Sequence, residues 1–149
     1  MESHLANSHD AELILKLYDM RREATMRKAR HWVAFDFQPT TAQEIVNVMR
    51  DYHSDHSNWL RQVVSYWEMA ASLVVHGAVN ADLYLDSNGE GLFVYNKLEP
   101  FIEEIQKINA GMPFMRNTAT MVEKFPTAKD RFQRIRAAMQ ARQAQQQQK

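Results

Sequence analysis

The sequence contains no cysteine among its 149 residues. Without thiols the chain can form no disulfide, no thiolate metal site and no cysteine nucleophile, which excludes several classes of enzyme and secreted protein. We expect a protein of the reducing cytoplasm. Net charge of one sign is also missing, because 18 Lys and Arg balance 18 Asp and Glu. The chain as a whole therefore has no field that would attract nucleic acid or acidic lipid.

Glycine and proline are scarce, at four residues each, and the chain has no long apolar run. The longest, at 69–75, is far shorter than the roughly 20 residues of a membrane-crossing helix. The N-terminus lacks the basic start and unbroken apolar core of a secretory signal, so we expect neither export nor membrane insertion. Abundant Met, Ala, Leu, Glu, Gln and Arg favour helix instead.

This composition predicts an all-α fold, a single-domain bundle of five to seven helices. No segment alternates apolar and polar residues as a half-buried strand would. The segment at about 57–77 has the widest apolar face, which predicts a buried central helix. We expect residues 1–9 to form a flexible N-terminus, 10–139 the helical domain and 140–149 a disordered Gln-rich tail.

The helix boundaries are predicted from residues that cap helices or break them. The first helix is expected to span about 25 residues, well above the usual helix length. The expected N-terminal caps, in chain order, are Ser8 or Asp10, Thr41 with Glu44, Asp55 or Ser57, Asn80, and Ser87 with Glu90. Pro100 lies within a helical pattern, where it either kinks one helix or begins another.

Three stretches of the chain are similar to a known family. They are LYDMRREATMRKARHW, SYWEMAASLVVHGAVNADLYLDSNGE and VYNKLEPFIEEI. They resemble a family of bacterial helical proteins classed as a domain of unknown function, over about Leu13 to Lys129. The resemblance implies an all-helical fold and a bacterial source, and it supplies no assigned reaction, because its most characteristic residues pack and cap helices.

Oxygen-bearing side chains at alternate positions from residue 86 mimic the opening of a calcium loop. The candidate ligands are Asp86, Asn88 and Glu90. The twelfth position of such a loop needs a bidentate glutamate, and here it is the cation Lys97. A helix cap beside a tight bend is therefore the favoured interpretation.

His53 and His56 are spaced so that both imidazoles could reach one zinc ion. Their segment reads as a polar turn between helices, where side chains face water. A solvated turn is the favoured interpretation, and we expect no metal and no cofactor.

Glu68 follows an aromatic pair in the most apolar helix, where a carboxylate can acquire a raised pKa and act as an acid or base. Tyr66 and His76 are the residues that could share a pocket with it. The alternative is structural, with Glu68 solvated or paired with an arginine and His76 at the end of its helix. No third group completes a catalytic set, which favours the structural alternative.

Opposite charges are separated along the chain. Residues 40–114 carry four basic and ten acidic side chains, whereas residues 115–149 carry eight basic and two acidic ones. Arg131, Arg134 and Arg136 are the candidate interaction residues of the basic last helix. They could bind nucleic acid, but pairing with the acidic middle, within one molecule or between two, is the simpler interpretation.

These observations favour a non-enzymatic protein-interaction or regulatory module, whose partner is itself, as a homodimer, or another protein. Nucleotide-binding loops, nucleophile elbows and zinc-protease motifs are all absent from the sequence. Two alternatives stay open. One is a small-molecule-binding or enzymatic bundle with a pocket near Glu68 and His76, and the other is nucleic-acid binding through the last helix.

Overall fold

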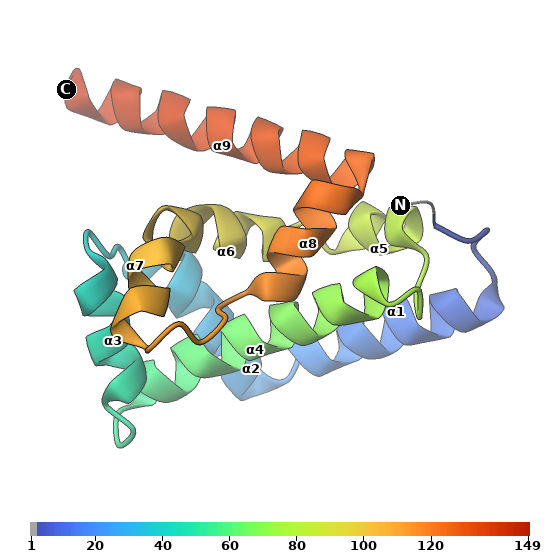
Figure 1. Ribbon diagram of the computed structural model, residues 1–149, viewed down its shortest axis with the longest axis horizontal. Helices are drawn as coiled ribbons and strands as arrows, with labels where there is room; N and C mark the ends of the chain where they lie inside the picture. Colours follow the sequence, from blue (N-terminus) through green and yellow to red (C-terminus); the bar gives the residue numbers. More distant parts are fainter. Residues whose placement is uncertain (1–2) are drawn as a thin grey trace.

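A computed structural model describes residues 3–149, and their regular secondary structure is helical, with no strand among them (Figure 1). The prediction of an all-α fold is therefore confirmed. Its elements are α1 (Ser8–Arg21), α2 (Ala24–His31), the π-helix η1 (Trp32–Asp36), α3 (Ala42–Arg50), α4 (Asp55–Val75), α5 (Ala81–Ser87), α6 (Glu90–Leu98), the 3-10 turn η2 (Glu99–Phe101), α7 (Ile102–Ile108), α8 (Arg116–Lys124) and α9 (Pro126–Gln147).

The expected five to seven helices are too few, because the chain breaks at points where a continuous helix was predicted. The first helix ends at Arg21, and Glu23 accepts hydrogen bonds from the backbone N–H groups of Thr25 and Met26, at 2.9 Å each. A side chain that caps N–H groups in this way begins a new helix, α2. After His31 the same run continues as the π-helix η1.

The 21-residue helix α4 packs against α2, α3, α8 and η1 and contributes many buried side chains. Its largest, Trp67, is 1% exposed. Helix α6 approaches this ring closely at Gly91, where an added Cβ would lie 2.8 Å from the indole. The absence of a side chain at Gly91 therefore permits the contact between α6 and Trp67.

Two of the predicted caps are present. Thr41 accepts a hydrogen bond from the Glu44 N–H at 3.1 Å. The Glu44 carboxylate accepts a hydrogen bond from the N–H of Thr40 rather than from that of Thr41. Asn80 accepts one from the N–H of Leu83 at 2.8 Å and begins α5.

Three predicted caps are wrong, and at two of these helices a neighbouring side chain reaches the free N–H groups instead. Asn7 caps α1, with Asp10 completing its capping box, and Ser54 caps α4. The predicted box of Ser87 and Glu90 does not form. Gly89 precedes α6 without a side-chain cap.

Pro100 lies in the turn η2, which separates α6 from α7. Proline lacks an N–H and suits the first turn of a helix, so the chain begins a new segment here instead of kinking a continuous one.

The two ends of the chain differ in their contacts. Asn80 donates to the carbonyl oxygen of His4, and the N–H of Ala81 donates to Ser3 Oγ at 2.8 Å, so the described part of the predicted flexible N-terminus is tied to the start of α5. Residues 1 and 2 lie outside the described residues. Residues 140–147 of the predicted disordered tail form the end of α9, which is exposed and extends beyond the rest of the molecule (Figure 1). Across residues 3–149, no helix has the length and apolar character needed to cross a membrane.

Candidate functional site

Tyr66, Glu68 and His76 all belong to α4 or its end, but each is engaged with a different part of the molecule. Tyr66 donates its hydroxyl to the carbonyl oxygen of Leu17 at 2.5 Å, and burial raises its pKa. Exposed His76 places Nδ1 2.8 Å from the carbonyl oxygen of Ser72, one turn earlier in its own helix. These hydrogen bonds hold Tyr66 and His76 against different parts of the molecule.

Glu68 caps helix α8. Its carboxylate accepts hydrogen bonds from the N–H of Asn117 at 2.5 Å, the N–H of Thr118 at 3.0 Å and the hydroxyl of Thr118 at 2.8 Å. Met115, which precedes α8, has a left-handed backbone and no side chain able to cap. Glu68 therefore supplies from α4 the acceptor that α8 lacks.

The candidate calcium ligands do not share a common contact. Asn88 is buried and donates to the carbonyl oxygen of Tyr84 at 2.9 Å, whereas Asp86 is exposed on α5. Glu90 forms an ion pair with Arg30 at 2.6 Å. Among residues 3–149, no group of three or more His, Asp or Glu side chains is placed to hold a metal ion.

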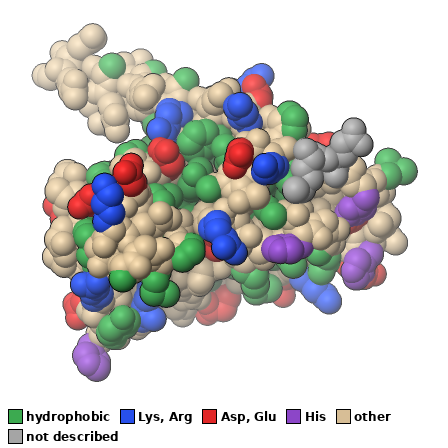
Figure 2. Space-filling view, in the orientation of Figure 1, with side chains coloured by type: hydrophobic (Ala, Val, Ile, Leu, Met, Phe, Trp, Pro, Cys, Tyr) green, Lys and Arg blue, Asp and Glu red, His purple; other side chains and the backbone are tan. Residues whose placement is uncertain are grey.

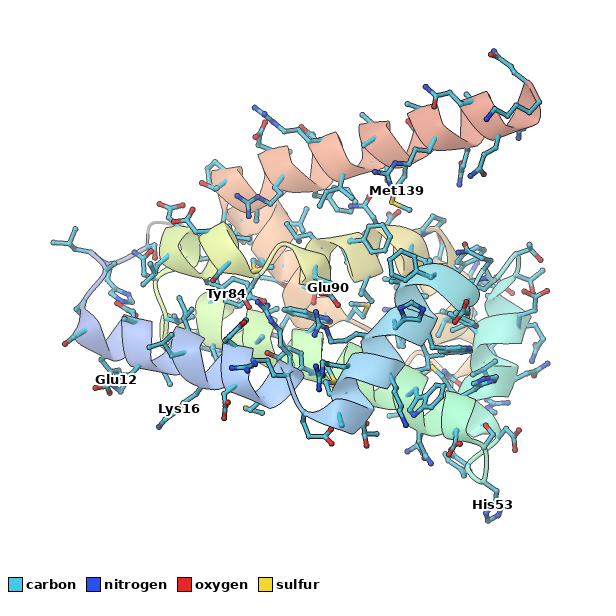
Figure 3. All side chains as sticks on the ribbon, turned by 180° about the vertical axis from the view of Figure 1, so that it is seen from behind. Glu12, Lys16, His53, Tyr84, Glu90 and Met139 are labelled. Carbon is cyan, nitrogen blue, oxygen red and sulfur yellow. The ribbon has the colours of Figure 1, made fainter. Side chains whose placement is uncertain are left out.

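The two candidate histidines also separate. His53 lies at the tip of the turn before α4 and points away from the molecule (Figure 3). His56 instead stacks on Trp32, with ring centroids 4.4 Å apart.

The three candidate arginines of α9 have partners within the chain. Arg136 pairs with Glu99 at 2.9 Å, Arg131 donates to the carbonyl oxygen of Leu85, and exposed Arg134 pairs with Asp130 at 2.9 Å. The contact between Arg136 and Glu99 joins the basic last helix to the acidic middle of the chain. On the face shown in Figure 2, basic and acidic side chains are interspersed.

A cluster of aromatic rings forms the most distinctive surface feature, where η1 meets the first turns of α4. Trp32 stacks on Phe37 on one side, at 4.7 Å between centroids, and on His56 on the other. Trp59 lies 6.2 Å from Trp32 and 5.6 Å from His56. Both tryptophans are only half-buried, so the cluster presents apolar rings to solvent.

These tryptophans line an open hollow of about 530 Å³, which we call the tryptophan hollow. Its lining residues are Ala24, Arg27, Lys28, His31, Trp32, Asp36 and Trp59. Arg27 and Lys28 are exposed, and neither forms an ion pair or a side-chain hydrogen bond within residues 3–149. Two cations against the single carboxylate of Asp36 give this surface a positive balance.

Lys97 holds the π-helix that carries Trp32. Its ammonium group reaches from α6 and donates to the carbonyl oxygens of Val33 at 2.6 Å, Ala34 at 3.2 Å and Phe37 at 2.6 Å. Burial lowers the pKa of Lys97 to about 8, against the opposing influence of Asp36. Short π-helices are frequent at functional sites, and this cation satisfies carbonyl groups at the end of the segment.

The sequence reasoning missed this site. It interpreted the basic residues of the first helical region as neutralised by acidic neighbours on the same helix. In the structure Arg30 pairs with Glu90 of α6, whereas Arg27 and Lys28 face the hollow. The available signal was the spacing of Arg27, Lys28, His31 and Trp32, which places cations beside an aromatic ring on one side of a helix.

Comparison with known proteins adds a family without an activity. A family model described as "Domain of unknown function (DUF4760)" matches residues 6–125, a range that includes every residue lining the tryptophan hollow. No curated protein and no solved structure matches the chain.

Proposed function

The chain belongs to the DUF4760 family, and from the surface of this domain we propose a non-enzymatic interaction module that binds an acidic segment of a partner protein. The segment places an aromatic or long aliphatic side chain against the exposed surfaces of Trp32 and Trp59 and carboxylates beside Arg27 and Lys28. The observation that carries the proposal is the tryptophan hollow with its cationic edge.

The composition of the hollow supports a protein partner. Tryptophan and arginine are enriched at protein interfaces, where a few large side chains in well-packed pockets account for most of the binding energy. Trp32 and Trp59 offer such a pocket, and Lys97 holds the segment that carries Trp32. Because the hollow is open on its outer side, it suits one side chain of a longer segment.

The charges at the edge indicate an acidic occupant. Arg27 and Lys28 are solvated and free of ion pairs in the described chain, so a carboxylate can approach them without displacing an internal partner. Complementary charge accelerates association and selects the partner, and salt weakens such contacts.

A non-enzymatic role is supported by the positions of the candidate catalytic residues. Glu68 caps α8, Tyr66 forms a hydrogen bond with α1, and His76 forms one with the last turn of α4. Nucleic-acid binding through α9 has less support, because Arg131, Arg134 and Arg136 each have a partner within the chain.

Fluorescence anisotropy with three labelled peptides tests the proposal. One peptide carries glutamates around a Leu-Phe pair, the second has glutamine at each glutamate, and the third has serine in place of Leu-Phe. We expect the first to bind most tightly, and added salt to weaken it. Lys28→Glu should reduce its affinity by about tenfold, equivalent to about 1.4 kcal/mol, and Trp59→Ala by more.

The matched control is Lys16→Glu, because Lys16 points away from the body on α1 (Figure 3). It should leave peptide affinity unchanged. Equal affinity for the acidic and glutamine peptides, or full affinity in Lys28→Glu, contradicts the proposal. Salt-sensitive binding of a DNA duplex that only Arg134→Glu abolishes would favour the nucleic-acid alternative.

The remaining expectations belong to the same proposal. We take α4 as the central buried helix of the module and expect a bacterial, cytoplasmic protein. A second copy is an alternative occupant of the tryptophan hollow. Light scattering after size-exclusion chromatography should show a monomer, whereas a dimer that Lys28→Glu dissociates would make the partner a second copy.

A further inference from the structure

A second hollow lies beside helix α2, next to the tryptophan hollow, and shares Arg27 and His31 with it. It has a volume of about 510 Å³. Its lining residues are Arg27, Arg30, His31, Ala34, Phe35, Glu90, Phe93 and Arg142. They come from α2, η1, α6 and the far end of α9, so we call it the α9 hollow.

One ion pair within the α9 hollow is already satisfied. Arg30 donates to both carboxylate oxygens of Glu90, at 2.9 and 2.6 Å, and also to the carbonyl oxygen of Arg21 at 3.1 Å. Glu90 lies between the ribbons of α6 and α2 (Figure 3). This bidentate pair neutralises its own charges and fixes the Arg30 guanidinium.

Two further cations line the hollow, of which Arg27 also interacts electrostatically with Glu23 at the start of α2. Neither Arg27 nor Arg142 forms an ion pair or a side-chain hydrogen bond with any described residue. Because the charges of Arg30 and Glu90 cancel, Arg27 and Arg142 leave the lining with an excess of two positive charges. This count leaves out His31, which also lines the hollow. An anion placed here meets guanidinium groups from α2 and from α9, which are distant in the sequence.

The other part of the lining is apolar. Phe35 is 69% exposed, an unusually high exposure for a large apolar side chain. Its ring also contacts that of His31, with centroids 4.9 Å apart. Together with Ala34 and half-buried Phe93, it offers an apolar surface beside the cations.

From this juxtaposition we propose that the α9 hollow binds a small anionic amphiphile, a molecule with one acidic head and an aliphatic or aromatic body. The head lies between Arg27 and Arg142, and the body covers Phe35 and Phe93. Arg142 lies outside the matched family range of residues 6–125, so the site joins the domain to the helix that follows it. The two sites share Arg27 and His31 but differ in their other lining residues, and this inference does not depend on the interaction proposed above.

The test is a fluorescence titration of the full chain with 1-anilinonaphthalene-8-sulfonate, an anionic aromatic probe. We expect the probe to bind saturably and decanoate to displace it. Decanol lacks the charge and inorganic phosphate lacks the apolar body, so each should displace the probe at least about tenfold less well. Decanoate should also raise the melting temperature, because it binds the folded state alone.

Arg142→Gln should reduce the affinity for the probe and for decanoate by about tenfold. Arg142→Lys should reduce it by less, because it keeps the positive charge and loses only the bidentate contact of the guanidinium. The matched control is Arg134→Gln, on the same helix but paired with Asp130 outside the hollow. Unchanged circular dichroism in each variant shows that the probe is not reporting unfolded protein. Binding that is unsaturable, or that survives Arg142→Gln, overturns the proposal.

The two proposals fail separately. Lys28 lines the tryptophan hollow and not the α9 hollow, whereas Arg142 lines the α9 hollow and not the tryptophan hollow. Lys28→Glu should therefore weaken the acidic peptide and leave the probe bound, and Arg142→Gln should do the reverse. If each variant lost binding of both the acidic peptide and the probe, the assignment of two sites would be wrong.

Discussion

Glu68 illustrates how one residue can have two plausible interpretations in a sequence and a single role in a structure. A carboxylate beside tryptophan suggests acid or base chemistry. Its three acceptor contacts with Asn117 and Thr118 show that it caps a helix from another part of the chain. The backbone conformation of Met115, with φ of 53°, leaves α8 without a cap of its own.

Replacing Glu68 by alanine should lower the free energy of unfolding by about 1–3 kcal/mol, because buried N–H groups lose their acceptor. Urea denaturation measures this loss. Glu104→Ala, at an exposed glutamate of α7, is the control and should cost at most about 0.5 kcal/mol. Equal losses in the two variants would contradict the capping role.

At the scale of elements, Asp10 connects α1, the N-terminal segment and α5. It is 1% exposed and accepts hydrogen bonds from the N–H of Asn7 at 2.8 Å and the N–H of Asn80 at 2.9 Å, while His4 Nε2 lies 2.9 Å from both its oxygens. Burial opposes ionisation, but these contacts prevail and hold the pKa of Asp10 below its ordinary value of 3.8.

This shift predicts acid sensitivity. A carboxylate with a depressed pKa stabilises the fold above its ordinary pKa of 3.8, and this contribution is lost as the pH falls through the lower folded value. Asp10→Asn should therefore be less stable at neutral pH and should lose less stability on acidification than the parent chain. Urea midpoints across the acidic range measure both effects, with exposed Asp19→Asn as control. Parallel pH profiles for parent and Asp10→Asn would contradict the linkage.

At the scale of the whole molecule, helix α9 has two distinct parts. Its first half packs on α8 and α6 and carries the pair between Arg136 and Glu99, whereas residues 140–149 are all exposed. Figure 2 shows the projecting end as mostly uncharged polar atoms. The exposure of residues 140–149 agrees with weak attachment of this end to the rest of the molecule. The disorder of the tail stays a prediction.

Truncation after Gln140 should change the free energy of unfolding by no more than about 0.5 kcal/mol, because it removes no buried side chain. Truncation after Lys129 should destabilise the chain by several times as much, because it removes Phe132, Ile135 and Arg136 from the interface with α6. Thermal and urea denaturation measure both. A large loss from the shorter truncation would show that the tail contributes to the core.

The amino-acid sequence by itself determined the helical class, the broad helix-rich organisation and two of the caps, Thr41 and Asn80, because periodicity and caps act over three or four residues. The tertiary structure decided which residues meet. Glu68 caps α8 from α4, Lys97 reaches from α6 to the carbonyl groups of η1, and Arg142 lines one hollow with Arg27. The two proposed sites depend on such long-range contacts, and local patterning cannot specify them because they arise only when separate helices pack together.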